Sequence, residues 1–201
     1  MKHCRSALVA AVLWAAAAAA ADAPFWESKT PAQWTAAEIA LLLSESPWAT
    51  APLEGGTPVF LASSPLLREA ELQLRLRADS EGAAEVKGDE DDYFNYIAQN
   101  PGKHIVVATR VANLSAFSDG REVKQMEKEC YLRAGGRKKI LAVGHFPPTP
   151  SDPYLRLLFP RLPLDGVKTL SVLLYVPGNP KPYTKVEFRV KDLVYRGKTE
   201  Y

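Results

Sequence analysis

Cysteine is nearly absent from this 201-residue chain, which holds two cysteines, three histidines and two methionines. Two thiols, Cys4 and Cys130, are too few for the disulfide framework that staples many small secreted domains. Neither Cys-x-x-Cys nor His-Glu-x-x-His occurs, so the ligand spacing of the common zinc sites is missing. Stability must therefore come from a hydrophobic core, and the 47% apolar content is enough to build one.

The chain also lacks a large excess of charge of either sign, because it has 25 basic and 23 acidic residues. A nearly neutral chain lacks the long-range attraction that draws proteins to nucleic acid or to anionic membranes. The sequence also lacks the Gly-x-Ser-x-Gly elbow of serine hydrolases and the glycine-rich patterns that bind phosphates. We therefore expect no nucleic-acid partner, no cofactor, no bound metal and no identifiable catalytic residue.

The N-terminus has the pattern of a secretory signal peptide. Lys2 and Arg5 form a basic head, and an alanine-rich apolar run extends over residues 7–21. Small side chains at its end suit a signal peptidase, which predicts cleavage after Ala21, with Ala23 as the second choice. The run of about fifteen residues is shorter than the roughly twenty that span a bilayer, so we expect no permanent membrane anchor after cleavage.

Cleavage would leave residues 22–201, which we expect to be exported to the periplasm or beyond and to fold as a single domain. Loss of Lys2 and Arg5 lowers the basic residues to 23, equal to the 23 acidic ones. Cys130 would then be the lone cysteine and could form no disulfide within the chain. Its apolar neighbours suggest a strand, so we expect the thiol to be buried.

A short N-terminal helix is the clearest predicted element, over residues 36–45. Thr35 and Glu38 have the spacing of a capping box, and Trp34 is placed for a hydrophobic staple. Pro47 ends the helix, because a proline disfavours the helical conformation in the residue before it. The helix is short and amphipathic, so it must pack on another element to be stable.

Residues 66–78 are consistent with either a helix or a strand. Leucines at alternate positions from Leu72 to Leu76 favour a strand. Ser64-Pro65 is a good helix start, and strong helix formers follow it, so we prefer the helix. The spacing of apolar residues over 93–98, after an acidic run, predicts another short helix that stops at Asn100-Pro101-Gly102.

The remaining sequence predicts an antiparallel sheet of about five to seven strands, because short apolar runs follow one another through short turns. The expected strands are 57–62, 104–111, 130–133, 138–146, 155–159, 169–176 and 186–195, with 123–128 left open. We expect 130–133 and 138–146 to form a hairpin and 169–176 to lie centrally with both faces covered. A bulge near Lys191-Asp192 would reconcile the two halves of the last strand. The fold class is therefore α+β, with short N-terminal helices packed on a mainly antiparallel sheet.

Two short end motifs also carry a resemblance. The N-terminal motif combines Phe25-Trp26, the cap Trp34-Thr35-x-x-Glu38 and the segment Ser46-Pro47-Trp48-Ala49. The C-terminal motif is Val190-Lys191-Asp192-Leu193-Val194-Tyr195-x-Gly197-Lys198. This combination resembles a group of uncharacterised secreted bacterial proteins of similar length. The resemblance implies an exported module with a helix over 64–78. It implies no catalytic residues, because the function of that group is unknown.

Two possible metal sites each have a simpler structural interpretation. His104 and His145 both fall in predicted strands, where ordinary structural histidines are far commoner than a shared metal site. Asp89-Glu90-Asp91-Asp92 is the best calcium candidate, but it lacks the alternating ligands and central glycine of a calcium loop. A solvated helix start explains these acids equally well, since carboxylates favour the positive end of the helix dipole.

Two side-chain clusters also have a simple structural interpretation. Arg133, Arg137, Lys138 and Lys139 form a basic turn beside Tyr131, which is typical of a solvated hairpin tip or of a patch for an acidic partner. Phe25, Trp26, Trp34 and Trp48 flank the first helix. They could line a ligand site, but we prefer the interpretation that they dock the helix.

Three functional hypotheses follow from these patterns. The first is an exported, non-catalytic module that binds a protein or an envelope component through a free sheet edge or an apolar patch. The second is a secreted or periplasmic hydrolase with a dispersed site built from two carboxylates, which requires a pocket between them. The third is a small-ligand carrier that uses the N-terminal aromatic residues. The sequence alone leaves the partner, the oligomeric state and the strand order open.

Overall fold

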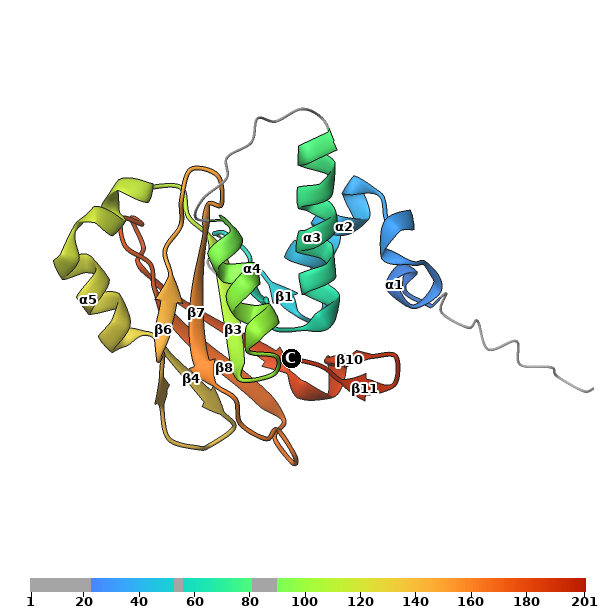
Figure 1. The fold of residues 1–201 in the computed structure, drawn as a ribbon. Helices are drawn as coiled ribbons and strands as arrows, with labels where there is room; N and C mark the ends of the chain where they lie inside the picture. The colour runs from blue at the N-terminus through green and yellow to red at the C-terminus, as the bar shows by residue number, and fades with distance from the viewer. Residues whose placement is uncertain (1–22, 53–55, 81–89) are drawn as a thin grey trace, which may run out of the picture.

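The computed structural model describes residues 23–52, 56–80 and 90–201, so the predicted signal peptide over residues 1–21 lies outside the described residues. Helices and strands alternate irregularly along the chain (Figure 1). The α-helices are α1 Phe25–Ser28, α2 Ala36–Ser44, α3 Pro65–Ser80, α4 Glu90–Gln99 and α5 Gly120–Glu129. In the described part of the chain, no helix is long and apolar enough to cross a membrane.

The strands form two larger antiparallel sheets and one small hairpin. The first sheet, sheet A, has the order β1-β2-β3-β7-β6, and the second, sheet B, has the order β5-β4-β8-β9. Sheet A consists of β1 Ala49–Thr50, β2 Val59–Leu61, β3 His104–Arg110, β7 Tyr154–Pro160 and β6 Gly144–Phe146. Sheet B consists of β5 Ile140–Leu141, β4 Tyr131–Ala134, β8 Thr169–Tyr175 and β9 Tyr183–Arg189. The C-terminal hairpin pairs β10 Val194–Tyr195 with β11 Lys198–Thr199.

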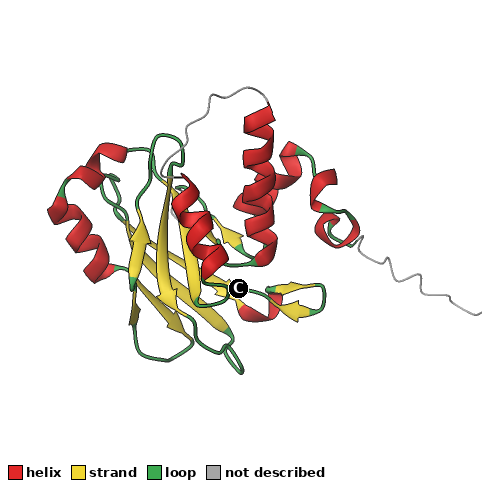
Figure 2. Ribbon diagram, viewed as in Figure 1, coloured by secondary structure: helices red, strands yellow, loops and turns green. Residues whose placement is uncertain are grey.

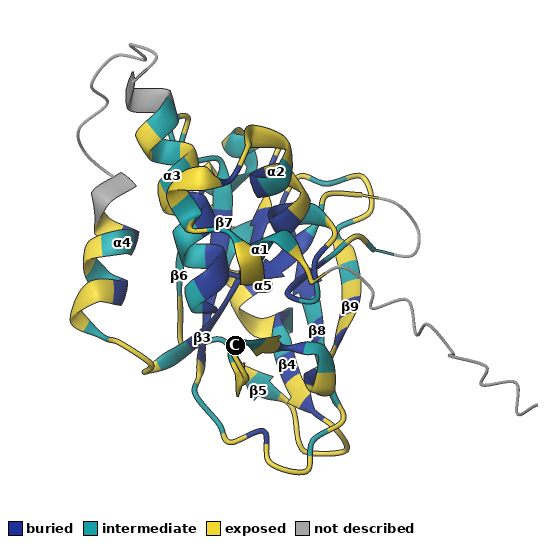
Figure 3. Ribbon diagram, turned by 90° about the vertical axis from the view of Figure 1, so that its right-hand side faces the viewer, coloured by how far each residue is buried: buried dark blue, intermediate teal, exposed yellow. Residues whose placement is uncertain are grey.

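Sheet A is the middle of three layers. Helices α3 and α4 cover one of its faces (Figure 2), and sheet B lies on the other side (Figure 3). The five central residues of both β3 and β7 are therefore buried on either face of the sheet. In β8 and β9, by contrast, the residues buried against sheet A alternate with more exposed ones. This arrangement is an α+β fold with short N-terminal helices and antiparallel sheets, as predicted.

The N-terminal helices form where their caps indicate. The Thr35 hydroxyl accepts a hydrogen bond from the Glu38 N–H at 3.2 Å, and the Thr35 N–H donates to the Glu38 carboxylate at 2.7 Å. This reciprocal pair starts α2 and confirms the predicted capping box. Helix α3 begins at Pro65, which confirms the helix for 66–78, and α4 covers the predicted helix over 93–98. The open segment 123–128 belongs to α5, whose cap is the Asp119 side chain.

Several strand predictions need correction. The single predicted sheet is two sheets, because helices cover only one face of sheet A and a second apolar layer is needed on the other. The predicted strand 138–146 is likewise split, since β5 pairs with β4 in sheet B and β6 pairs with β7 in sheet A. Strand β8 is central in sheet B, but its outer face is only half covered. Finally, a 3-10 turn over Val190–Asp192 replaces the predicted bulge.

Candidate functional site

The two strand histidines do not meet in the structure. The pairing of both strands with β7 places His104 and His145 on opposite faces of sheet A. His104 stacks on Tyr96, with ring centroids 5.8 Å apart, and burial together with Lys103 lowers its pKa. His145 lies 3.6 Å from a carboxylate oxygen of Glu127. Within residues 23–52, 56–80 and 90–201, no three His, Cys, Asp or Glu side chains converge as a metal site.

The other predicted candidates are placed as follows. Asp89 of the acidic run lies outside the described residues, and α4 begins at Glu90, so residues 90–92 of the run lie in the first turn of a helix. In the basic turn, the cationic groups of Lys139 and Arg133 lie 4.2 and 5.4 Å from the centre of the Tyr131 ring. Arg137 donates to the carbonyl oxygen of Pro163 at 3.0 Å. Part of this positive patch is thus bound to the protein's own surface.

The N-terminal aromatic residues pack edge to face on one another. Ring centroids lie 5.0 Å apart for Phe25 and Trp26, and 6.3 Å apart for Trp26 and Trp48. Trp34 and Trp48 are buried, and the Trp48 indole N–H donates to the carbonyl oxygen of Glu200 at 2.6 Å. These contacts dock the N-terminal segment against the C-terminus of the chain. They support the docking interpretation over a ligand-lining one.

A buried polar cluster around Arg156 was not foreseen from the sequence. Arg156 lies on β7 beneath α3 and α4, and its guanidinium donates to Glu71 at 2.7 Å and also to Asp152. Its central carbon lies 4.3 Å from the centre of the Tyr93 ring. Burial opposes the charge of Arg156, but Glu71 and Asp152 outweigh it and raise its pKa further. Burial raises the pKa of Glu71 despite the nearby guanidinium.

This cluster brings two carboxylates to one buried guanidinium. Arg156 and Glu71 are only 2% and 4% exposed, and one guanidinium lies between the two acids. Glu71 is buried, whereas the Asp152 side chain is 17% exposed. The geometry favours a role in joining the helices to sheet A.

The feature that distinguishes the surface is the free edge of β9. Strands at the edges of the two larger sheets expose unpaired backbone N–H and C=O groups, and proteins commonly blunt such edges by keeping the strands short. The edge strands β1, β5 and β6 follow this rule with two or three residues each. Strand β9 has seven residues, Tyr183–Arg189, and pairs with β8 along its whole length. Within the described chain it is the longest edge strand of these two sheets.

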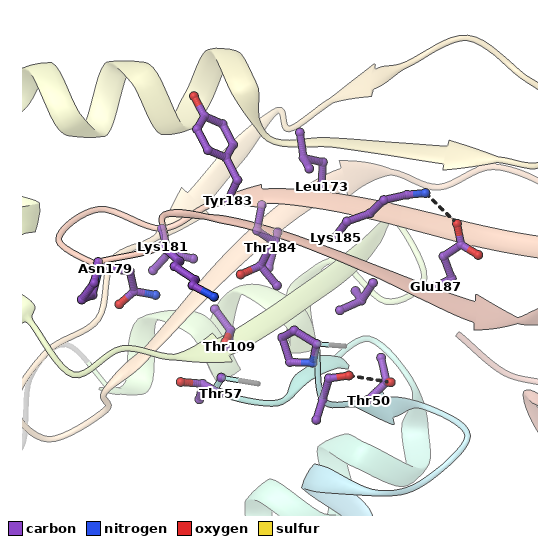
Figure 4. Close-up of a pocket in the computed structure, with 17 residues that line it drawn as sticks. Thr50, Thr57, Thr109, Leu173, Asn179, Lys181, Tyr183, Thr184, Lys185 and Glu187 are labelled. Atoms are coloured by element: carbon purple, nitrogen blue, oxygen red, sulfur yellow. Dashed lines mark hydrogen bonds and ion pairs between the residues drawn. The ribbon is translucent and has the colours of Figure 1, made fainter. Parts of the chain in front are cut away.

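A groove of about 990 Å³ lies along this edge (Figure 4). One wall is formed by β9, and the opposite wall comes from residues 50–52 and 56–57, at and after β1. Threonine hydroxyls and lysine side chains line it together with apolar groups; the residues labelled in Figure 4 include Thr50, Thr57, Thr109, Lys181 and Thr184. The groove therefore lies between β9 of sheet B and neighbouring β1 of sheet A.

The backbone of β9 alternates between its two sides. Val190 N–H donates to the carbonyl of Lys168, and Val176 N–H donates to that of Pro182, so even-numbered residues bond towards β8. By the same alternation, Tyr183, Lys185, Glu187 and Arg189 direct their N–H and C=O groups to the free edge. An added strand would find a regular ladder of donors and acceptors there.

The side chains of β9 follow a second alternation. Val186 and Phe188 are buried between the sheets, whereas Lys185 and Glu187 lie on the exposed outer face and form an ion pair at 2.9 Å. Ser171 also donates to Glu187 at 3.2 Å, and these contacts, that of Lys185 first, lower the pKa of Glu187. The sequence showed this alternation over 186–190. It held no signal for the position of the strand at a sheet edge, which depends on long-range pairing.

No family model matches the chain, and no curated protein matches it. A solved structure from Burkholderia pseudomallei K96243, described as a novel protein of unknown function, is similar over 75% of this chain and 81% of that chain. Its sequence identity is 10% and its TM-score is 0.44. The predicted resemblance to secreted bacterial proteins stays a prediction.

Proposed function

We propose that this protein is an exported, non-catalytic module that binds an extended protein segment along the free edge of β9. The observation that carries this proposal is the seven-residue edge strand with its outward backbone groups unpaired by any neighbouring strand of the described sheets. Extended peptides add to such edges by continuing the hydrogen-bond ladder, and alternate side chains then supply specificity.

The groove beside β9 suits this mode of binding. Alternate side chains of an added strand would point into the space between β9 and β1, which Thr50 and Thr184 line. The other side chains would lie on the outer face near Lys185 and Glu187. The groove thus provides contacts for both faces of a bound strand.

The hydrolase hypothesis gains less support from the geometry. Of the described residues that line the groove, Glu187 is the one carboxylate, and it is paired with Lys185. Glu71 and Asp152 do converge, but both are paired with the Arg156 guanidinium, and Glu71 is buried. The small-ligand hypothesis depends on aromatic residues that pack on one another.

Lys185→Pro tests the proposal directly. Proline removes the outward N–H of residue 185 and places a ring at the edge, while the bonds of the even-numbered residues to β8 remain. We expect peptides selected from a random library on the wild-type protein to lose about tenfold or more in affinity for this variant. Isothermal titration calorimetry measures the loss.

Lys185→Ala is the matched control, because it removes the same charge and keeps the backbone N–H. The selected peptides should bind this variant far better than Lys185→Pro, and circular dichroism should show both variants folded. Peptides that bind Lys185→Pro as tightly as the wild type would overturn strand addition at β9.

A further inference from the structure

We infer that the strand that pairs with β9 is β9 of a second copy of this chain. The inference rests on the proposed function, since it names the occupant of the same edge. It goes further because it fixes the partner, the strand direction and the register. The resulting dimer would join two copies of sheet B into one continuous antiparallel sheet.

The sequence of β9 is complementary to itself when read in opposite directions. In an antiparallel pair with a two-fold axis at Val186, Lys185 of each copy lies directly opposite Glu187 of the other. Both side chains already lie on the exposed outer face, where they can meet their counterparts. Opposite charges placed directly across an antiparallel pair stabilise it, and like charges destabilise it.

The hydrogen-bond pattern supports the same register. The residues that face the free edge are the odd-numbered ones, so a paired strand must place its own odd-numbered residues opposite them. The axis at Val186 does this over the full length of the strand, with Lys185 opposite Glu187 and Tyr183 opposite Arg189. An axis at Lys185 or at Glu187 also matches the backbone, but it places Lys185 against Lys185 or Glu187 against Glu187.

The ends of the strand are compatible with this arrangement. Arg189 is held by Asp192 at 2.7 Å, and the Tyr183 hydroxyl donates to Glu129 at 3.0 Å. In the dimer, the Arg189 guanidinium of one copy comes opposite the Tyr183 ring of the other, a pairing of cation and aromatic side chain. A C2 pair uses the same patch on both copies, so the Lys185–Glu187 and Tyr183–Arg189 contacts each occur twice.

Charge reversal on the purified protein tests the inference. Sedimentation equilibrium of the wild type is expected to show a monomer and a dimer in concentration-dependent exchange. In the proposed dimer, residue 185 of each copy lies opposite residue 187 of the other. Lys185→Glu therefore places a carboxylate opposite a carboxylate in both of these pairs, and Glu187→Lys places an ammonium group opposite an ammonium group in both. Each variant alone should therefore dimerise on the order of tenfold more weakly. The double variant Lys185→Glu/Glu187→Lys should recover the wild-type association.

An equimolar mixture of the two single variants is the decisive arm. In each single variant, residues 185 and 187 of the same strand repel each other, and mixing does not change this. Across the proposed interface, however, the mixture pairs two glutamates of one chain with two lysines of the other. We expect the mixture to form a heterodimer, and recovery can then come only from contacts between chains.

Three results would overturn the inference. A wild-type protein that stays monomeric while selected peptides still bind at β9 would remove the second copy as occupant and leave the proposed function in place. A dimer that is insensitive to both single variants and to Lys185→Pro would place the interface elsewhere. Absence of both self-association and peptide binding would overturn this inference and the proposed function together.

Discussion

At the scale of single residues, Arg156 connects three elements of the fold. It lies on β7, bonds Glu71 of α3, and places its guanidinium on the Tyr93 ring of α4. Removing one partner from a buried ion pair costs about 3–5 kcal/mol, because an uncompensated charge remains. The cluster therefore makes the docking of both helices depend on a few polar side chains.

Glu71 makes the stability of this cluster depend on pH. Two carboxylates share one guanidinium, and burial raises the pKa of Glu71 above its ordinary value of 4.5. At a pH between 4.5 and this raised value, Glu71 keeps its proton in the folded protein but has released it in the unfolded chain. The free energy of unfolding should consequently fall as the pH rises from about 4.5 through the raised pKa of folded Glu71. Below about pH 4.5 the contribution of Glu71 to the free energy of unfolding is fully present.

Glu71→Gln tests this pH dependence, because glutamine cannot release a proton. Urea unfolding at a series of pH values should show a shallower slope for the variant than for the wild type across this window. Equal slopes for the two proteins would contradict the raised pKa of Glu71.

Sequence reasoning at this scale succeeded where the signal is local. The capping box of Thr35 and Glu38 and the burial of Cys130 follow from near neighbours. Burial raises the pKa of the Cys130 thiol to about 12, as expected for an enclosed structural cysteine. The Arg156 cluster could not be foreseen, since Glu71 and Arg156 are 85 residues apart in the sequence.

At the scale of elements, the turn before β9 sets where the edge strand begins. Pro177-Gly178-Asn179-Pro180 joins β8 to β9, and Gly178 has a φ of +75°. A Cβ atom at Gly178 would lie 2.6 Å from the Ala116 Cβ and 2.7 Å from the Asn113 side-chain nitrogen. This turn therefore packs tightly on the segment that precedes α5, and only glycine fits there.

Gly178→Ala should be more destabilising than an ordinary glycine substitution. It combines the left-handed backbone penalty of roughly 1–2 kcal/mol with the steric overlap. Gly166→Ala is the matched control, because Gly166 has a φ of +69° but no neighbouring atom within 4 Å of the added Cβ. Thermal or urea unfolding should rank Gly178→Ala clearly below Gly166→Ala; equal stabilities would show that the turn can move away from Ala116.

Element prediction failed where tertiary pairing decides the outcome. Residues 138–146 look like one strand, yet the chain passes from sheet B to sheet A within them. The alternation around 186–195 is interrupted by a 3-10 turn rather than a bulge, because the chain leaves sheet B at Val190 and enters the C-terminal hairpin. Both departures depend on neighbours that are remote in the sequence.

At the scale of the whole molecule, the α+β class was predictable and the number of sheets was not. Short turns between apolar runs indicate antiparallel strands, but they do not say which strands share a sheet. The site depends on this missing information. Strand β9 has a free edge because it is the last strand of sheet B, in which β8 pairs with it on one side and β4 lies beyond β8.

Amide hydrogen exchange along β9, resolved residue by residue, tests the binding edge most directly. In dilute protein, the amides of Thr184, Val186 and Phe188 should be protected by β8, while those of Lys185 and Glu187 exchange rapidly. Raising the protein concentration, or adding a selected peptide, should protect Lys185 and Glu187 as well and erase the alternation. Protection of Lys185 and Glu187 already in dilute protein, or rapid exchange at both positions under binding conditions, would contradict strand addition at β9.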